Sequence, residues 1–334
     1  MRRLILACAA LASITSISQQ PEQAPYDSTT STPRVLTASS RIKFGIPAFG
    51  FTGRSSCDSA GDIVFNVGRM GALGPFLRVS SDGGSHIVYS LPSELSGQAN
   101  VAWATSPGGD FFVLYEDFKE YKLIRFKSDG NVAAISSLDV PQGVDVMHLA
   151  VADNETVFAG GYRESADPRL KPRSGFAAIF NRSGKLVRDL NALAPDYKLK
   201  AAEQGPVDGD AIAAEDGRFY FLVDQRIVAL NQSGEVEKEI PFTKPSPSAH
   251  AVQVDFSKGT LSILFHDVHR VGAGKPVNVE VSTILINAQN GEVRGNYVFN
   301  PATTQNVLCF DGQEGYALFA LEGKMAAKDT VPIR

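Results

Sequence analysis

The chain has 334 residues, of which 43% are hydrophobic, 20% charged and 9% aromatic, with 30 Gly and 18 Pro. That much apolar side chain can form a large core, which excludes a disordered or a collagen-like chain. The formal net charge of −4 at pH 7 argues against a nucleic-acid-binding domain built on basic charge.

The first 18 residues are typical of an export signal. Two arginines precede an unbroken apolar run from Leu4 to Ala12, small polar residues follow, and a cut after Ser18 fits. The run is too short for a membrane span, which takes about 20 residues, and no later segment approaches that length. We therefore expect an exported protein, periplasmic or extracellular, with no membrane span. Residues 19–34 are rich in Ser, Thr, Pro and Gln, which predicts a flexible leader.

From residue 35 onward one unit recurs six times. Each unit has a first turn, an apolar strand, a variable loop, another strand and, in five copies, a second turn closed by Gly. The first turns centre on Gly61, Gly109, Glu155, Gly217, Gly259 and Gly315, at intervals of 42 to 62 residues. The second turns end on Gly83, Gly130, Gly184, Gly234 and Gly291. Glycine there supplies the positive φ that a tight hairpin requires.

These units predict an all-β fold, a six-bladed β-propeller of four-stranded antiparallel blades in a single domain at 35–334. The sixth unit ends one strand short. Residues 35–44 alternate apolar and polar side chains, so we expect this N-terminal segment to supply that strand and close the ring. A seven-bladed propeller, with a blade inside the 62-residue interval, and a pair of β-sandwiches are the alternatives. The interval offers no pair of strands about a Gly turn, which favours six blades.

In repeat period and turn chemistry, Val35 to Arg334 resembles the six-bladed propeller superfamily, with its NHL, TolB-like and gluconolactonase-like branches. No residue motif is specific to one branch, so the resemblance implies a fold and no catalytic residues. In gluconolactonase-like propellers a metal at the channel mouth polarises a lactone carbonyl. The resemblance to such a site is positional only.

The first strands of the units begin at the end that bears the long loops, which we call the top face, so their opening residues surround the channel mouth. The candidate ligand-binding residues there are Arg54, Asn100, Asp145, His148, Asp208, Asp210, His250 and Asn306. Such side chains could bind Ca²⁺, which takes six to eight oxygens, or a transition metal. We name Asp208, Asp210 and His250 as candidate metal ligands. Channel mouths are also polar without a metal, and no cofactor other than such a divalent cation is indicated.

Two of the top-face loops are basic, and Arg169 and Arg270 are their candidate contacts to an anionic ligand. Acidic residues lie among them, so an ordinary solvated loop is the favoured explanation of the pattern. A zinc site between His266 and His269 is disfavoured, because three residues along a strand put two side chains on opposite faces.

Two cysteines, Cys57 and Cys309, remain after signal cleavage. They fall at near-equivalent positions in the first and last units, which become neighbours when a ring closes. An oxidising compartment then permits a disulfide between them, and two buried thiols are the alternative.

Two functions fit this sequence. We favour an exported binding or interaction module that engages a ligand or protein partner through its top-face loops and channel mouth. The alternative is a metal-dependent hydrolase or lactonase with its site at the mouth. The sequence has no Gly-x-Ser-x-Gly motif for nucleophilic catalysis, and it leaves open whether the protein is an enzyme.

Overall fold

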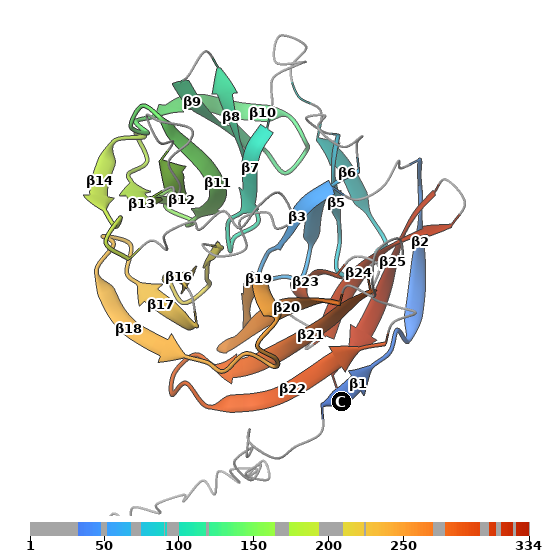
Figure 1. Cartoon of the computed structure of the whole chain (residues 1–334). Helices are drawn as coiled ribbons and strands as arrows, with labels where there is room; N and C mark the ends of the chain where they lie inside the picture. The colour runs from blue at the N-terminus through green and yellow to red at the C-terminus, as the bar shows by residue number, and fades with distance from the viewer. Residues whose placement is uncertain are drawn as a thin grey trace, which may run out of the picture.

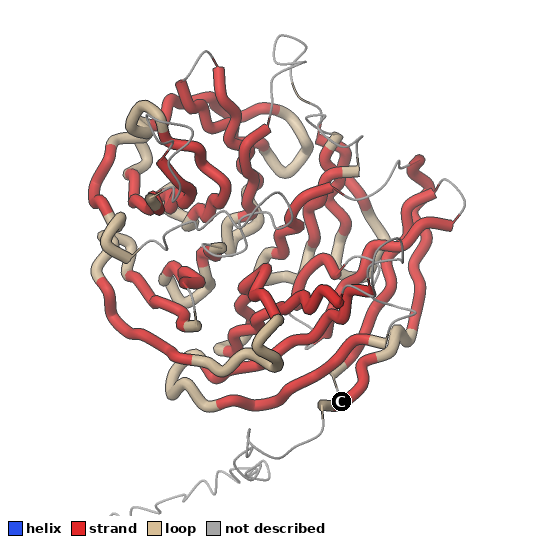
Figure 2. Tube along the Cα trace, in the orientation of Figure 1, coloured by secondary structure: helices blue, strands red, loops and turns tan. Residues whose placement is uncertain are grey.

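The structure is a computed structural model whose described part consists of strands, turns and loops (Figure 2). Among these residues no helix is long and apolar enough to cross a membrane. The predicted signal peptide and most of the leader lie outside them. The described residues are 33–47, 52–67, 75–89, 91, 100–117, 120–163, 174–193, 210–223, 225–269, 278–300, 307–311, 315–322 and 325–333.

The described strands form six sheets, numbered here in chain order (Figure 1). Sheet 1 contains β3 (Thr52–Cys57), β4 (Ile63–Asn66), β5 (Phe76–Val79) and β6 (His86–Tyr89). Sheet 2 contains β7 (Asn100–Thr105), β8 (Phe111–Asp117), β9 (Glu120–Phe126) and β10 (Val132–Leu138). Sheet 3 contains β11 (Val144–Val151), β12 (Val157–Arg163), β13 (Gly175–Phe180) and β14 (Leu186–Asp189).

The other three sheets come from the second half of the chain, and two of them also take an N-terminal strand. Sheet 4 contains β15 (Ala211–Ala213), β16 (Phe219–Val223), β17 (Arg226–Leu230) and β18 (Val236–Pro241). Sheet 5 contains β19 (Ala249–Ser257), β20 (Thr260–His269), β21 (Asn278–Asn287), β22 (Val293–Phe299) and β1 (Arg34–Leu36). Sheet 6 contains β23 (Val307–Asp311), β24 (Gly315–Glu322), β25 (Met325–Pro332) and β2 (Ser40–Pro47).

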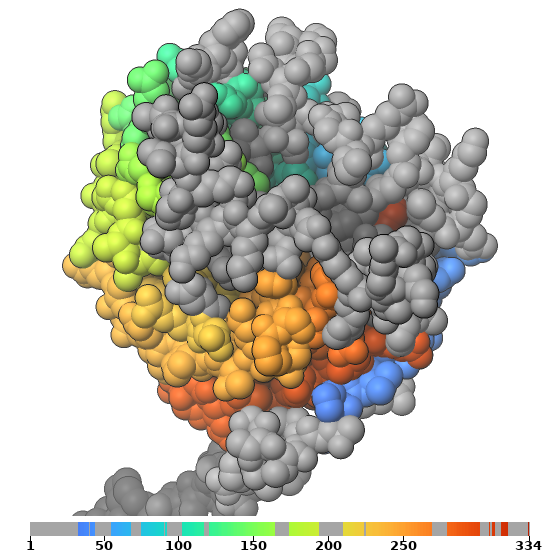
Figure 3. All heavy atoms as spheres, in the orientation of Figure 1, coloured from blue at the N-terminus to red at the C-terminus, as the bar shows by residue number. Residues whose placement is uncertain are grey.

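The sheets are arranged as the blades of a β-propeller, with the first strand of each nearest the centre (Figure 1). Each of these inner strands contacts the inner strand of the next sheet, in the order β3, β7, β11, β15, β19, β23, and β23 contacts β3. The described residues of the second half of the chain form one continuous side of the molecule (Figure 3). The prediction of an all-β propeller of antiparallel blades is confirmed.

The turns that the sequence indicated have the expected backbone. All five glycines that close the second turns, and four of the residues at the first turns, have positive φ: Gly83, Gly130, Gly184, Gly234, Gly291, Gly61, Gly109, Gly217 and Gly259. Glu155 occupies the equivalent place in the third unit with φ of 62°. These short connections lie at one end of the sheets, which we call the short-turn end.

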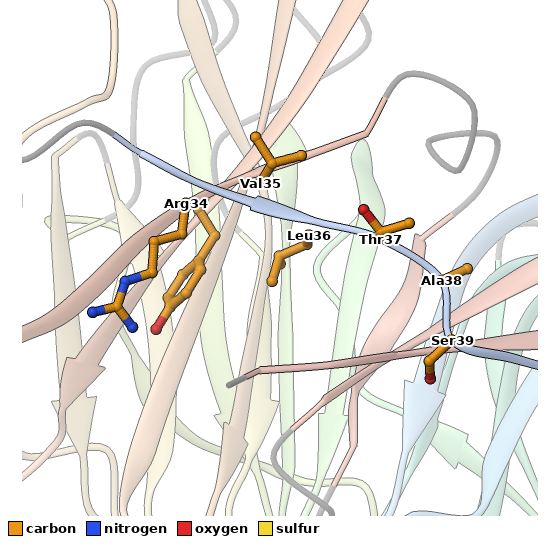
Figure 4. A pocket seen from close by; sticks show the side chains of 7 residues that line it. Arg34, Val35, Leu36, Thr37, Ala38 and Ser39 are labelled. Carbon is orange, nitrogen blue, oxygen red and sulfur yellow. The ribbon is translucent and has the colours of Figure 1, made fainter.

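The N-terminal segment differs from the single strand that we predicted over residues 35–44. It divides into β1, which pairs in parallel with β22, and β2, which pairs antiparallel with β25. Leu36 is buried against Tyr297 and Phe299 of sheet 5, and the chain then crosses to sheet 6. The crossing residues border a shallow pocket beside Tyr297 (Figure 4). Sheet 5 therefore has five strands, where the repeat predicted four.

The core consists of apolar clusters between neighbouring sheets. One contains Phe76 and Tyr89 of sheet 1 and Phe111 and Phe126 of sheet 2; the rings of Tyr89 and Phe111 are 4.8 Å apart, centre to centre. Other clusters join sheets 2 and 3, 3 and 4, 4 and 5, 5 and 6, and 6 and 1. The middle strands of each sheet are thus covered on both faces, which is why β4, β13 and β16 are buried along their whole length.

Candidate functional site

A β-bulge gives several inner strands the same shape next to the centre. The ladder shifts register directly before Ala102 in β7, His148 in β11 and Gln253 in β19. Asp210 has the matching place in sheet 4, because its carbonyl accepts the hydrogen bond of Leu222 N–H. His148, Asp210 and Gln253 are therefore equivalent residues of three successive sheets.

His148 and Asp210 face each other between sheets 3 and 4. The distance from His148 Nδ1 to Asp210 Oδ1 is 3.6 Å, and the side chains are 13% and 1% exposed. This is longer than a direct hydrogen bond, but the carboxylate favours a hydrogen on Nδ1, which leaves the lone pair on Nε2. His148 Nε2 is buried without a hydrogen-bond partner among the described residues. A buried polar atom in that condition is uncommon and indicates a place for water or a ligand.

Carboxylates on the inner strands also link one sheet to the next. Asp210 Oδ2 accepts a hydrogen bond from Val254 N–H at 2.7 Å. One sheet further on, Asp255 Oδ2 accepts from Phe310 N–H at 3.1 Å and from the Gln253 side-chain amide at 2.8 Å. Such bonds between a buried charge and a backbone N–H are among the stronger ones in proteins. They fix the spacing of the inner strands around the centre.

The first two junctions between sheets use neutral side chains for the same purpose. Ser56 Oγ accepts a hydrogen bond from Thr105 N–H at 2.9 Å. Tyr121 Oη donates to the Val144 carbonyl at 2.8 Å and accepts from Val146 N–H. Burial raises the pKa of Tyr121 to about 12, so its hydroxyl stays protonated as this bond requires.

At the junction of sheets 6 and 1 the link is covalent. Cys309 of β23 and Cys57 of β3 form a disulfide, with Cα atoms 6.1 Å apart and 252 residues between them in sequence. Cys309 is fully buried. The bond joins the inner strands of the first and last sheets.

The remaining predicted residues fall into three groups. Asp145 of β11 is half-buried and lies opposite Tyr162 in the ladder. Arg54 and Asn100 lie on β3 and β7, but Ala102, not Asn100, is the residue of sheet 2 equivalent to His148. Asn100 lies on the other side of the register shift and corresponds to Val146 of β11. The other four candidates lie outside the described residues: Asp208, Asn306, Arg169 and Arg270.

His250 lies in a different setting from Asp210. It is the direct ladder partner of His266 on β20, and burial lowers the pKa of His266. The sequence pattern connects His266 with His269 and gives no sign of its pairing with His250, because cross-strand partners 16 positions apart become visible only when the hairpin register is known.

The described residues do not by themselves fit Ca²⁺. No group of three His, Cys, Asp or Glu side chains that could hold an ion occurs among them. Asp210 and His148 offer one carboxylate and one imidazole, and one oxygen of that carboxylate already accepts a backbone hydrogen bond. Ca²⁺ takes six to eight oxygen ligands. We therefore derive no catalytic step through a metal at this position.

Comparison with known proteins identifies the fold and not a family. No known protein family matches the sequence, and no curated protein matches it. Among solved structures, a luciferin-regenerating enzyme is 10% identical, with 88% of this chain and 95% of the other covered and a TM-score of 0.51. A calcium-binding protein, regucalcin from Agrobacterium tumefaciens, is 12% identical, with coverage of 91% and 98% and a TM-score of 0.51.

A gluconolactonase from Xanthomonas campestris is also similar, at 13% identity, with coverage of 92% and 97% and a TM-score of 0.48. At such identities the likeness concerns the arrangement of strands. The chain therefore shares a β-propeller fold with the luciferin-regenerating enzyme and with regucalcin.

Proposed function

We propose that this chain is an exported six-bladed β-propeller that binds a ligand or protein partner at its channel mouth and top face. Six sheets, with inner strands that contact one another in a closed order, support the blade count. The ladder between β2 and β25 supports closure by an N-terminal strand. The sequence of residues 1–18 supports export, and a disulfide suits an oxidising compartment.

The observation on which the binding role rests is the pair His148 and Asp210. Neither side chain is needed to complete a ladder, and burying His148 Nε2 without a partner among the described residues costs about 1–3 kcal/mol. A small polar ligand with an O–H or N–H group could donate to His148 Nε2 and recover that cost. Gln253, at the same position one sheet further on, would add an amide to the same ring of side chains.

The test is a thermal-shift screen of the chain from residue 19 onward against small hydroxylated, acidic and lactone compounds. We expect a compound that raises the Tm of the wild type and has no effect on His148→Ala or Asp210→Asn. His86→Ala, which changes an exposed histidine of β6, is the matched control and should respond as the wild type does. A compound whose shift survives in both channel variants would place the binding site elsewhere.

A metal-dependent hydrolase or lactonase is the second candidate. It is favoured by the proximity of an imidazole and a carboxylate, both metal-capable, and by a fold shared with a protein described as calcium-binding. Further ligands, such as Asp208, would then have to come from outside the described residues. Lactone hydrolysis that needs a divalent cation and is lost in Asp210→Asn would establish this function. If the chain binds less than one metal ion per molecule and hydrolyses no lactone, the role of a binding module is the one that stands.

A further inference from the structure

Two histidines lie side by side on the first hairpin of sheet 5. His250 of β19 and His266 of β20 are direct partners in the antiparallel ladder, so their side chains leave the sheet on the same face with Cβ atoms about 5 Å apart. Both side chains are half-buried. This is a separation that one ion coordinated by two imidazoles can bridge.

The face that carries both histidines is turned toward sheet 6. Leu264, two residues before His266, and Val281, its partner on β21, are buried in a cluster with Val307 and Phe310 of β23. His266 thus continues a buried stripe at the junction of the two sheets.

The intervening acidic residue does not compete for this pair. Asp267 alternates to the opposite face of β20, where its carboxylate accepts a hydrogen bond from Ser246 Oγ at 2.5 Å. The described residues contain no group of three possible metal ligands, so a two-histidine site would leave further coordination positions open to water.

Paired imidazoles in a partly apolar setting are ligands for first-row transition metals, whereas Ca²⁺ and Mg²⁺ prefer oxygen. We propose that His250 and His266 form a binding site for a transition-metal ion of the Zn²⁺, Ni²⁺ and Cu²⁺ class at the junction of sheets 5 and 6. This site is separate from His148 and Asp210 and does not rest on the binding role proposed for them.

The experiment is isothermal titration of the full chain with Ni²⁺, Zn²⁺ and Cu²⁺ alone, together with Tm measurements with each ion and with a chelator. We expect saturable binding of one ion per chain. His250→Ala and His266→Ala should each weaken it at least about tenfold, because a single imidazole holds these ions poorly. Saturating metal should raise Tm on the order of 5 °C, since only the folded chain presents the pair.

Two sets of control variants test the proposal. His86→Ala, which changes an exposed histidine of β6, should bind as the wild type does. His250→Gln and His266→Gln retain a polar side chain of similar reach, so they test the loss of the imidazole if an alanine variant fails to fold. Absence of saturable binding, or unchanged affinity in both glutamine variants, would overturn the proposal.

Discussion

Sheets 1 to 3 and sheets 4 to 6 are held to their neighbours in different places. In the first group two arginines join successive sheets at the short-turn end. Arg78 contacts Asp58 at 2.6 Å and Asp62 at 3.0 Å and donates to the Gly109 carbonyl of sheet 2. In the second group carboxylates join the inner strands at the centre, where Asp210 and Asp255 accept backbone hydrogen bonds from the next sheet.

The arginine links recur one sheet further on. Arg125 contacts Asp110 of its own sheet at 2.7 Å and Glu155 of sheet 3 at 2.5 Å. These links are remote from the channel mouth, so sheets 1 to 3 can be stable without constraining a ligand there. In sheets 4 to 6 the linking carboxylates stand among the candidate site residues. Substitutions of the linking residues in sheets 4 to 6 should therefore change stability and ligand binding together. Substitutions of the arginine links in sheets 1 to 3 should change stability alone.

The disulfide between the two halves should have the largest single effect. Cys57→Ser together with Cys309→Ser removes a bond that closes a loop of 252 residues, which costs about 5.5 kcal/mol in the chain-entropy account. We expect Tm to fall by roughly 10 °C, and a reductant to bring the wild type to the same value. If the reductant lowers the Tm of the double variant equally, the stabilisation does not come from this bond.

The two arginine links should differ in strength because their burial differs. Arg78 is 13% exposed and its partner Asp58 3%, whereas Arg125 is 34% exposed. Arg78→Met leaves a buried carboxylate unpaired and should cost about 3 kcal/mol in the free energy of unfolding. Arg125→Met should cost about 1 kcal/mol. Urea unfolding of both variants measures the difference, and equal losses would contradict the assignment of the effect to burial.

Sequence periodicity was sufficient for the propeller because turn glycines and apolar strands are local features. The positive φ of Gly83 or Gly130 needs only the residue itself and its neighbours. The contacts between blades could also be predicted, because a strand that is apolar on both faces must pack against another sheet on each side. The same reasoning placed Asp210 and His148 at the centre.

The errors came from features that depend on pairing. Which residue of β7 is equivalent to His148 depends on where the ladder shifts register, and the shift makes Ala102 the equivalent residue and Asn100 the counterpart of Val146. The division of the N-terminal segment into β1 and β2 depends on the packing of Leu36 against Tyr297 and Phe299 of sheet 5. The His250 and His266 pair depends on the register of one hairpin. None of these three features produces a periodic pattern that can be recognised in a single sequence.

Glu155 permits a finer test of the arginine links. It has φ of 62° where other first turns have Gly, a conformation that costs a non-glycine residue about 1 kcal/mol, and its carboxylate binds Arg125. Glu155→Ala keeps the strain and loses the ion pair, so it should be about 1 kcal/mol less stable than Glu155→Gly, which loses both. Chemical denaturation compares the two variants. Equal stability would mean that the turn is not strained.

The smallest expected effect is on the pH dependence of stability. Its sign shows whether burial or the charge of Arg78 has the larger influence on Asp58. Burial raises the pKa of Asp58, against the lowering effect of Arg78. A carboxyl whose pKa is higher in the folded state binds its proton more tightly there. Its contribution to stability is therefore fully present below the unfolded pKa and is lost as pH rises through the folded pKa.

The stability difference between the wild type and Asp58→Asn isolates this carboxyl, because the other groups titrate in both proteins. We expect the difference to favour the wild type more at about pH 3.5 than at about pH 7. Urea unfolding of both proteins at the two pH values measures it. A difference that grows toward neutral pH would mean that Arg78 outweighs burial, and that Arg78 and Asp58 form an ion pair of the conventional kind.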